Sequence, residues 1–333
     1  MSKKMIGVEV GSFRMKLVDC AGTSDERIIV VNVPDNLVQG NRIVSWDAMA
    51  EFIKETVKND KILANDAAIA IPKDLVFYKR VTMPAMTKDQ LKINLPFEFH
   101  DYIVDDKDKY IFDYAVIGKS FDEKGNVVEM DLLAVASEKE LVENYKTMFR
   151  RAGMKLTVIA PEFSALRNII KKYDEKQETV GQEDYAIVDL GHNSIKLHFF
   201  NRGEYEVTRV MEMGIREIDE LIAEKLDVDI HTANLYKETN KDGVLDSQEC
   251  LEIYDRIGVE VMRVLNFFDF NHQENNIRTI YCCGGGAMIS GMLNAIRENT
   301  DLRVAPINEL LETEYEDGSF VLEGVLALGI TRG

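Results

Sequence analysis

Two short segments of this chain repeat one pattern, and this repeat limits the possible folds more than any other feature. Residues 5–18 read as an apolar strand, a glycine turn and a second strand, and residues 186–200 read the same way. Both copies place an acid among apolar residues, then a glycine, three further residues, an apolar residue, a lysine and a leucine. Such strand–turn–strand units predict β-hairpins.

The two copies align without a gap. The matched pairs are Glu9 with Asp189, Gly11 with Gly191, and Lys16 with Lys196, each 180 positions apart. We interpret the match as an internal duplication. Chance alignment of two common units is the alternative that segments this short leave open. A chain of 333 residues also favours two lobes, each with its own core.

A third glycine segment follows an apolar strand at residues 279–283. It comprises Gly284, Gly285 and Gly286 and leads into a helical pattern at residues 287–298. Glycine turns let backbone amides approach phosphate oxygens, and a strand–glycine–helix unit often faces a nucleotide. Each turn alone is better explained as a structural turn, and neither GxGxxG nor a Walker motif is present. The ordered set of three is what indicates a nucleotide site.

Residues 81–160 have the pattern of a separate α+β module. Thr87 and Gln90 form a capping box that predicts a helix start, and Pro96 predicts a kink or a late start of the helix. One face of this helix would carry Leu91, Leu95, Phe99 and Tyr102. That apolar stripe is either the core of the module or a docking surface for a partner.

Other periodic segments complete the predicted architecture. A charged connector at residues 174–184 is the expected boundary between the lobes. The remaining expected strands are 66–71, 111–116 and 127–135, and the expected helices are 46–58, 138–152, 161–173, 215–226, 230–237, 248–270 and 320–330.

Composition excludes several function classes. The net charge of −18 disfavours nucleic acid and anionic membranes as partners, because such binding depends on Lys and Arg. No apolar run approaches the ~20 residues of a spanning helix, so we expect no direct membrane insertion. The four cysteines lack the spacing of a zinc site and indicate free thiols in a reducing compartment.

The ordered set of two hairpins and a glycine loop resembles the superfamily of actin, FtsA and chaperone ATPases. Nearly the whole chain also resembles the PilM family of type IV pilus assembly proteins. The segments that carry this second resemblance are residues 6–12, 81–85, 134–136, 152–154, 161–167, 188–191, 213–215, 283–287 and 326–329.

The resemblance implies an α/β, two-lobed actin-like fold, which is a duplicated ribonuclease H-like ATPase fold with an FtsA-type inserted subdomain. The first lobe would comprise residues 1–80, 161–184 and the C-terminal helix at 319–333. The inserted subdomain would be residues 81–160. The second lobe would be residues 185–318, with 215–258 as its smaller subdomain.

The resemblance also implies ATP with Mg²⁺ between the lobes. Asp189 and Glu9 are the expected metal residues, since Mg²⁺ prefers oxygen ligands and retains water. The residues expected to bind the nucleotide are Gly11, Ser12, Phe13, Lys16, Gly191, His192, Asn193, Gly214, Gly284, Gly285 and Gly286. Glu162 corresponds to a polar residue that faces the attacking water; an exposed carboxylate at a helix start explains it equally well.

Three residues depart from the pattern of the family. Glu9 stands where Asp is usual, Pro96 interrupts a helix, and Phe163 replaces a Pro after the acid. The first departure puts hydrolysis in doubt more than binding, because backbone amides supply much of the phosphate contact. We therefore expect ATP binding with weak or no hydrolysis.

The implied function is a cytoplasmic scaffold, peripheral to the inner membrane through its partners. These would be the cytoplasmic tail of a PilN-like membrane protein and other proteins of the pilus assembly platform, together with self-association. One alternative is an FtsA-like filament-forming protein of cell division, which ordinarily carries a C-terminal amphipathic helix. Another is a small-molecule kinase, which would need a catalytic base and a polar substrate cleft.

Overall fold

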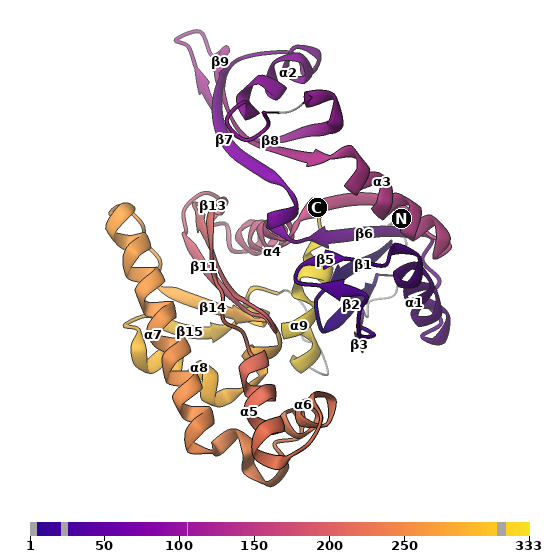
Figure 1. Cartoon of the computed structure of the whole chain (residues 1–333). Coiled ribbons are helices and arrows are strands. Elements are labelled where there is room, and N and C mark those ends of the chain that lie inside the picture. Colours follow the sequence, from indigo (N-terminus) through magenta and orange to yellow (C-terminus); the bar gives the residue numbers. More distant parts are fainter. Residues whose placement is uncertain (1–4, 21–25, 105, 312–317) are drawn as a thin grey trace.

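A computed structural model describes residues 5–20, 26–104, 106–311 and 318–333. Two lobes, each built on a five-stranded sheet, stand side by side, and a smaller module projects from one end (Figure 1). The first lobe contains the sheet of β1 to β3, β6 and β10, and the second lobe contains the sheet of β11 to β15. The predicted two-lobed architecture with an inserted subdomain is confirmed.

The sheet of the first lobe has the strand order β10-β6-β1-β2-β3. Its strands are β1 (Met5–Val10), β2 (Arg14–Asp19), β3 (Arg27–Asn32), β6 (Asp66–Ile71) and β10 (Lys155–Pro161). The first three strands are antiparallel, whereas β6 and β10 run parallel to β1. Helices α1 (Trp46–Asn59) and α3 (Lys139–Arg151) pack against each other in this lobe, and two short strands, β4 (Val38–Gln39) and β5 (Arg42–Ile43), form a separate pair.

The sheet of the second lobe repeats this plan in the order β13-β12-β11-β14-β15. Its strands are β11 (Tyr185–Leu190), β12 (Ile195–Asn201), β13 (Glu204–Met211), β14 (Thr279–Cys283) and β15 (Arg303–Pro306). Again an antiparallel hairpin begins the sheet and parallel strands extend it on the other side. Even the register repeats, because Glu9 lies opposite Lys16 just as Asp189 lies opposite Lys196. The sheet topology therefore supports an internal duplication.

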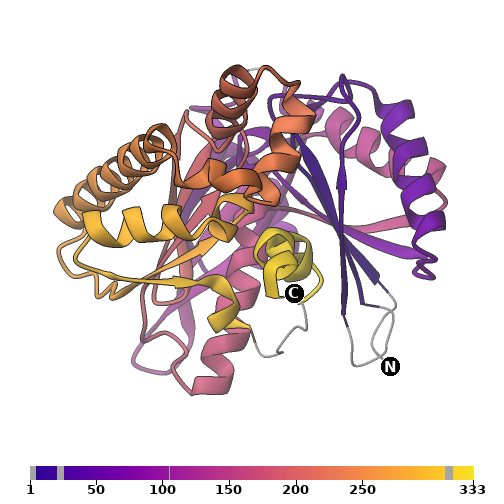
Figure 2. The same ribbon diagram turned by 90° about the horizontal axis from the view of Figure 1, so that it is seen from below.

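Two helices lie side by side between the sheets (Figure 2). These are α4 (Glu162–Gln177) and α9 (Gly318–Ile330), and α9 also packs on β1, β2 and β3. Glycines permit this close packing: a Cβ on Gly7 would come 1.8 Å from the carbonyl oxygen of Ala327, and one on Gly329 would come 2.3 Å from that of Ala165. The last helix thus returns to the first lobe, as expected.

The projecting module is a three-stranded antiparallel sheet covered by a short helix. Its strands are β7 (Phe77–Pro84), β9 (Val127–Glu138) and β8 (Tyr110–Phe121), in that order across the sheet. The predicted capping box of Thr87 and Gln90 is confirmed at the start of α2 (Lys88–Asn94). A 3₁₀ helix (Leu95–Phe99) with Pro96 near its start follows α2 directly, so the helix changes type at the proline and does not start late.

Packing divides the expected module of residues 81–160 between two parts of the molecule. Strand β10 pairs with β6 in the first lobe, and Tyr145, Met148 and Phe149 of α3 lie in the core of that lobe. The unit that projects is therefore formed by β7 to β9. Local patterns indicate strands and helices, but they do not indicate which sheet a strand joins.

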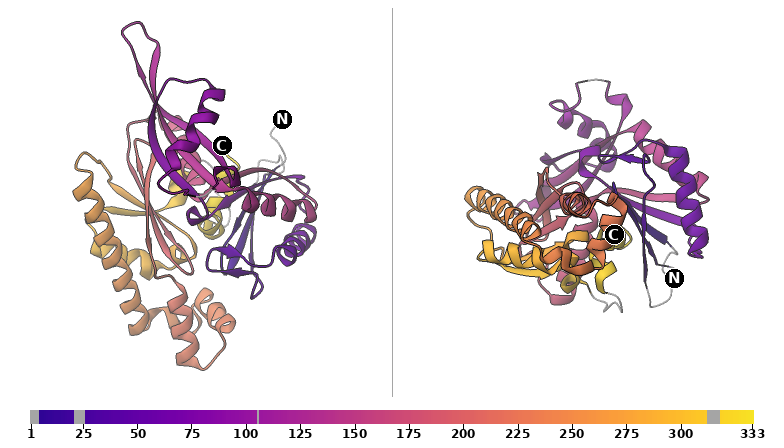
Figure 3. Two further views of the ribbon diagram at one scale, coloured as in Figure 1. Left: turned by 45° about the horizontal axis from the view of Figure 1, so that its top comes forward. Right: turned by 60° about the horizontal axis from the view of Figure 1, so that its bottom comes forward.

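Four helices complete the second lobe. They are α5 (Arg216–Leu226), α6 (Ile230–Glu238), α7 (Gln248–Asn271) and α8 (Ser290–Asn299). Figure 3 shows α5 and α6 at the end of the molecule opposite the projecting module. Short 3₁₀ helices occur at Lys73–Leu75, Lys107–Lys109, Lys241–Asp246, Gly285–Met288 and Ile307–Leu310. Among the described residues, no helix combines the length and apolar character needed to cross a membrane.

Candidate functional site

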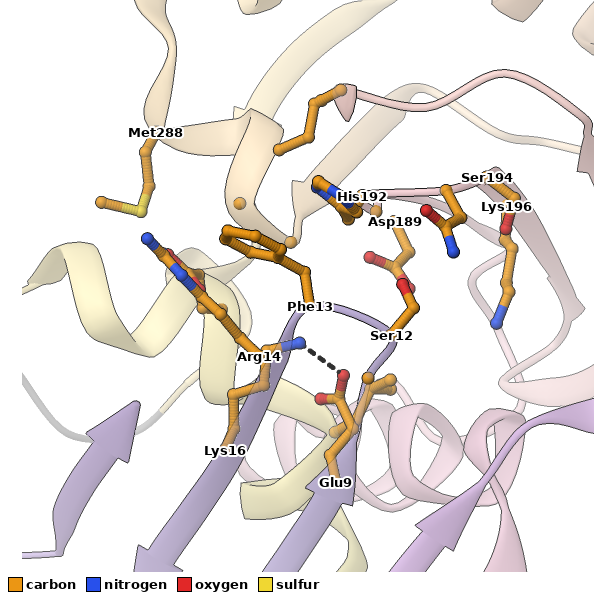
Figure 4. A pocket seen from close by; sticks show the side chains of 18 of the residues that line it. Glu9, Ser12, Phe13, Arg14, Lys16, Asp189, His192, Ser194, Lys196 and Met288 are labelled. Carbon is orange, nitrogen blue, oxygen red and sulfur yellow. Dashed lines mark hydrogen bonds and ion pairs between the residues drawn. The ribbon is translucent and has the colours of Figure 1, made fainter. Parts of the chain in front are cut away.

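A cavity lies where the two hairpin turns, the loop after β14, and helices α6 and α9 converge (Figure 4). Its volume is about 200 Å³. Eleven of the residues expected from the sequence line it: Glu9, Gly11, Ser12, Phe13, Lys16, Asp189, Gly191, His192, Asn193, Gly284 and Gly285. Segments far apart in the chain are thus brought together at one site, as the ordered set of three predicted.

The two turns are built alike. The amide of Gly11 donates to the carbonyl oxygen of Arg14 at 3.0 Å. A Cβ on Gly11 would come 2.7 Å from that oxygen, and a Cβ on Gly191 would come 2.7 Å from the carbonyl oxygen of Ser194. Both positions therefore require glycine for space, and both turns can present backbone amides to the cavity.

The glycine loop packs against the second hairpin. Gly284 has a φ of +83°, which favours glycine, and a Cβ there would come 2.5 Å from Oδ1 of Asp189. Gly286 and Gly214 do not line the cavity. A Cβ on Gly286 would come 2.7 Å from Cβ of Leu190, and one on Gly214 would come 2.2 Å from the carbonyl oxygen of His192. These two glycines therefore allow the neighbouring segments to pack closely against the second hairpin.

The carboxylates of Glu9 and Asp189 both line the cavity. Oε1 of Glu9 accepts a hydrogen bond from Nζ of Lys16 at 2.7 Å, whereas Oε2 is buried and has no hydrogen-bond partner within the described chain. Burial raises the pKa of Glu9; Lys16 opposes this rise and Asp189 adds to it. Burial alone would lower the pKa of Lys16, but the Glu9 carboxylate outweighs it and the pKa is raised.

This acid pair fits Mg²⁺ better than a metal held by protein ligands alone. No group of three His, Cys, Asp or Glu side chains in the described residues is arranged to hold a metal ion. Mg²⁺ characteristically uses one or two carboxylates and takes its other ligands from water and phosphate. A cation near the floor of the cavity would also satisfy Oε2 of Glu9.

Glu162 lies at the start of α4, behind the second hairpin. It is only 3% exposed, so its interpretation as an exposed helix-start carboxylate is wrong. Its Oε2 accepts from Nζ of Lys196 at 2.6 Å, and its Oε1 lies 3.5 Å from the amide nitrogen of Lys73. Burial would lower the pKa of Lys196, but the carboxylates of Glu162 and Asp189 together outweigh that effect and raise the pKa. A role for Glu162 in catalysis stays a prediction.

His192 is held between an aromatic ring and a buried ion pair. Its ring stacks on Phe13 with 4.5 Å between the centroids, and its Nδ1 lies 3.7 Å from Oδ2 of Asp219. That carboxylate is paired with Lys237 at 2.8 Å. Burial, with Lys237 nearby, lowers the pKa of His192 to about 3, so the imidazole is neutral near pH 7.

Sequence reasoning missed the contribution of α6 and of residues beside the glycine loop. The residues concerned are Arg14, Asn234, Lys237, Glu238, Met288, Ile289 and Glu323, all of which line the cavity. The helix carries no glycine motif. Its one available signal is the spacing of Asn234, Lys237 and Glu238, which places three polar side chains on one face.

The apolar stripe proposed for partner binding is mostly the core of the module. Leu91, Leu95 and Phe99 are 2%, 1% and 0% exposed and pack beneath the three-stranded sheet. Of the four expected contact residues, Tyr102 is the one whose side chain is half exposed. The short helix needs this stripe to cover the sheet, so Leu91, Leu95 and Phe99 present no surface to a partner.

A separate groove lies on the first lobe, beside the point where β9 of the module leads into α3. The first lobe contributes Arg42, Ile43, Trp46 and Leu75, while the end of β9 and helix α3 contribute Glu138, Glu140, Leu141, Asn144 and Tyr145. The rings of Trp46 and Tyr145 meet edge to face with 5.0 Å between centroids. This crease combines apolar surface with two carboxylates.

The family model described as type IV pilus assembly protein PilM matches residues 7–323. The chain belongs to this family. The solved PilM–PilN type IV pilus biogenesis complex is similar to it, with 19% identity, a TM-score of 0.79, and coverage of 99% of this chain and 98% of that one. The ethanolamine utilization protein EutJ from Carboxydothermus hydrogenoformans is similar at 14% identity and a TM-score of 0.58, covering 98% and 88%. The predicted actin-like fold and the resemblance to PilM are confirmed.

Proposed function

We propose that this member of the PilM family is a nucleotide-responsive scaffold that binds ATP with Mg²⁺ between its lobes and the cytoplasmic tail of a PilN-like protein at its surface. The observation that carries the proposal is the convergence of two duplicated glycine turns and a glycine loop on one cavity of a pilus assembly protein. The FtsA-like and kinase alternatives are not favoured, because the family match spans residues 7–323.

In this proposal the turn amides and Lys16 bind phosphate oxygens. Asp189 and Glu9 hold Mg²⁺ through its water shell, which neutralises part of the phosphate charge. The glycine loop, Met288 and the polar face of α6 bind the sugar and the base. The lining of the cavity supports this division because its carboxylates Glu9 and Asp189 come from the two hairpins, whereas a separate set of polar side chains comes from α6.

The partner is proposed from the similarity to the PilM–PilN complex over nearly the whole of both chains. We place the tail in the groove between α1 and α3 of the first lobe. Trp46 and Leu141 offer an apolar anchor site there, and Glu138 and Glu140 favour a tail with basic residues. Such binding would hold the protein at the inner face of the membrane, where other platform proteins and further copies of this chain are expected partners.

Asn193→Asp tests the nucleotide site. Asn193 lines the cavity, and a carboxylate of nearly the same shape would repel phosphate without disturbing the turn. Wild-type protein should melt several degrees higher with Mg²⁺-ATP, since a ligand stabilises the state that binds it, and the variant should lose most of this shift. Asn59→Asp, on the exposed end of α1, is the control and should keep it. An unchanged shift in Asn193→Asp would place the nucleotide elsewhere.

Leu141→Arg tests the groove, with a peptide of the PilN tail as the probe in isothermal titration calorimetry. We expect at least a tenfold loss of affinity, roughly 1.4 kcal/mol, because a few anchors carry most of the energy of such interfaces. Phe97→Arg, at an exposed position of the module, is the control and should bind as the wild type does. Both variants should keep the thermal shift with ATP. If Phe97→Arg loses binding and Leu141→Arg keeps it, the tail binds at the outer face of the module and not in the groove.

A further inference from the structure

The turns of the two duplicated hairpins differ at all three positions after the glycine: Ser12 matches His192, and the next two positions differ most in the size of their side chains. The second hairpin has small polar residues there, Asn193 and Ser194, whereas the first has Phe13 and Arg14 at the matching positions. The turns themselves are built alike, so the large side chains are not needed to form the first hairpin. Their contacts indicate what they do instead.

Phe13 joins the first hairpin to two elements of the second lobe. Its ring stacks on His192 of the second hairpin at 4.5 Å and 17°, and it lies 6.2 Å from the ring of His231 on α6 at 20°. On its far side His231 has Nε2 3.4 Å from Oδ2 of Asp35, which belongs to the first lobe. Aromatic contacts of this kind add to the stability of a closed arrangement.

Arg14 makes a second set of contacts across the mouth of the cavity. Its Nη1 donates to Oε1 of Glu323 on α9 at 2.7 Å, and its Nη2 donates to Oδ1 of Asn234 on α6 at 3.3 Å. The same guanidinium pairs with Glu238 at the end of α6. Because Glu323 is buried, this charge-assisted bond is stronger than an exposed one.

The cavity is small for the ligand proposed. Its volume of about 200 Å³ lies below the roughly 300–1,000 Å³ of typical ligand pockets. Figure 4 shows Phe13 and Arg14 side by side within it, with Met288 on one side and His192 on the other. The two side chains that bridge the lobes are therefore also the ones that fill the space.

We propose that Phe13 and Arg14 form an autoinhibitory latch, which holds α6 against the first hairpin and opens when a nucleotide enters. Phosphate oxygens compete with Glu238 and Glu323 for the guanidinium, and the ring of Phe13 leaves His192 as the cavity widens. Opening the latch breaks these contacts, and their free energy opposes binding of the nucleotide. The apparent affinity is therefore the affinity of the open form multiplied by the fraction of molecules that are open. This inference rests on the proposed nucleotide binding in the same cavity.

The chain supplies its own test variant, F13N/R14S, which gives the first turn the residues that the second turn has at these two positions. In the protein without added nucleotide, hydrogen exchange of residues 230–238 should become about tenfold faster, since α6 loses its contacts with the first lobe. Binding of a fluorescent ATP analogue with Mg²⁺, followed by stopped flow, should become about tenfold tighter, with the gain in the association rate. The control is F270N/R263S on the exposed face of α7, which should change neither quantity.

The exchange and binding measurements together decide whether the latch exists. Faster exchange with tighter binding supports the latch. Weaker binding of the analogue by F13N/R14S would overturn it, because Arg14 would then be a phosphate ligand in the closed arrangement. Unchanged exchange would overturn it as well, since α6 would be held by other contacts. Faster exchange with no binding by either protein would support the closing contacts and overturn the proposed nucleotide function instead.

Discussion

The ion pair of Glu162 bears directly on whether its carboxylate can act as a general base. A general base must accept a proton from water, but Oε2 of Glu162 already accepts from Lys196 at 2.6 Å. Breaking such a buried pair leaves an uncompensated charge, which typically costs several kcal/mol. The carboxylate is therefore better placed to position the second hairpin than to activate water.

We accordingly predict slow hydrolysis by the wild-type protein. With saturating ATP and Mg²⁺, steady-state phosphate release should stay below roughly 1 s⁻¹, near the low end of enzyme turnover. Asn193→Asp is the control that identifies release from this site, because it should bind ATP poorly. Turnover above this limit that falls a hundredfold or more in Glu162→Gln would make Glu162 a base after all, since general bases contribute about 10²–10⁴-fold.

At the scale of elements, the sequence predicted what local patterns encode. The hairpins follow from strand–glycine–strand spacing, and the start of α2 follows from the hydroxyl of Thr87 and the side chain of Gln90, each of which caps a neighbouring amide. Matching Glu9 to Asp189 also predicted the repeated register. These features depend on residues within a few positions of one another or on a direct repeat.

Pairing between distant elements was not predictable in the same way. Strand β10 joins β6 across more than eighty residues, so the module boundary expected at residue 160 could not be read from periodicity. Likewise, α6 reaches the cavity only because the fold brings it opposite Phe13. The stripe at Leu91 was ambiguous for a related reason: an apolar face on a helix does not say whether its cover is the same module or a partner.

One set of contacts ties the module and the segment that leads into it to the second lobe. Arg80 on β7 donates from Nη2 to the carbonyl oxygen of Tyr205 on β13 at 2.6 Å, and Nζ of Lys73 lies 3.5 Å from that of Thr208. Tyr205 also stacks on Phe163 of α4 at 3.9 Å. Since β13 pairs with β12 of the second hairpin, the module rests on the same sheet that bears the second glycine turn.

For the molecule as a whole, stability should depend on pH through a histidine in this sheet. His198 is fully buried; its Nδ1 lies 2.8 Å from Oγ1 of Thr208, and its Nε2 has no hydrogen-bond partner within the described chain. Burial lowers its pKa to about 3 from the usual 6.5. Between these two pH values the imidazole binds a proton in the unfolded chain but not in the native protein. The free energy of unfolding is therefore unaffected by His198 above pH 6.5 and decreases as the pH falls towards 3.

His198→Gln should remove this term, because Gln cannot titrate yet can still hydrogen-bond to Thr208. Between pH 7 and pH 5 the wild-type free energy of unfolding should fall by about 2 kcal/mol more than that of the variant, which is 1.5 pH units at 1.36 kcal/mol each. His192 remains in both proteins, so the variant keeps a similar term from that residue. Urea unfolding at the two pH values measures the difference, with His100→Gln, at an exposed histidine, as the control that should match the wild type. Equal pH dependence in all three proteins would mean that His198 carries a proton in the native state or that its surroundings open before the transition.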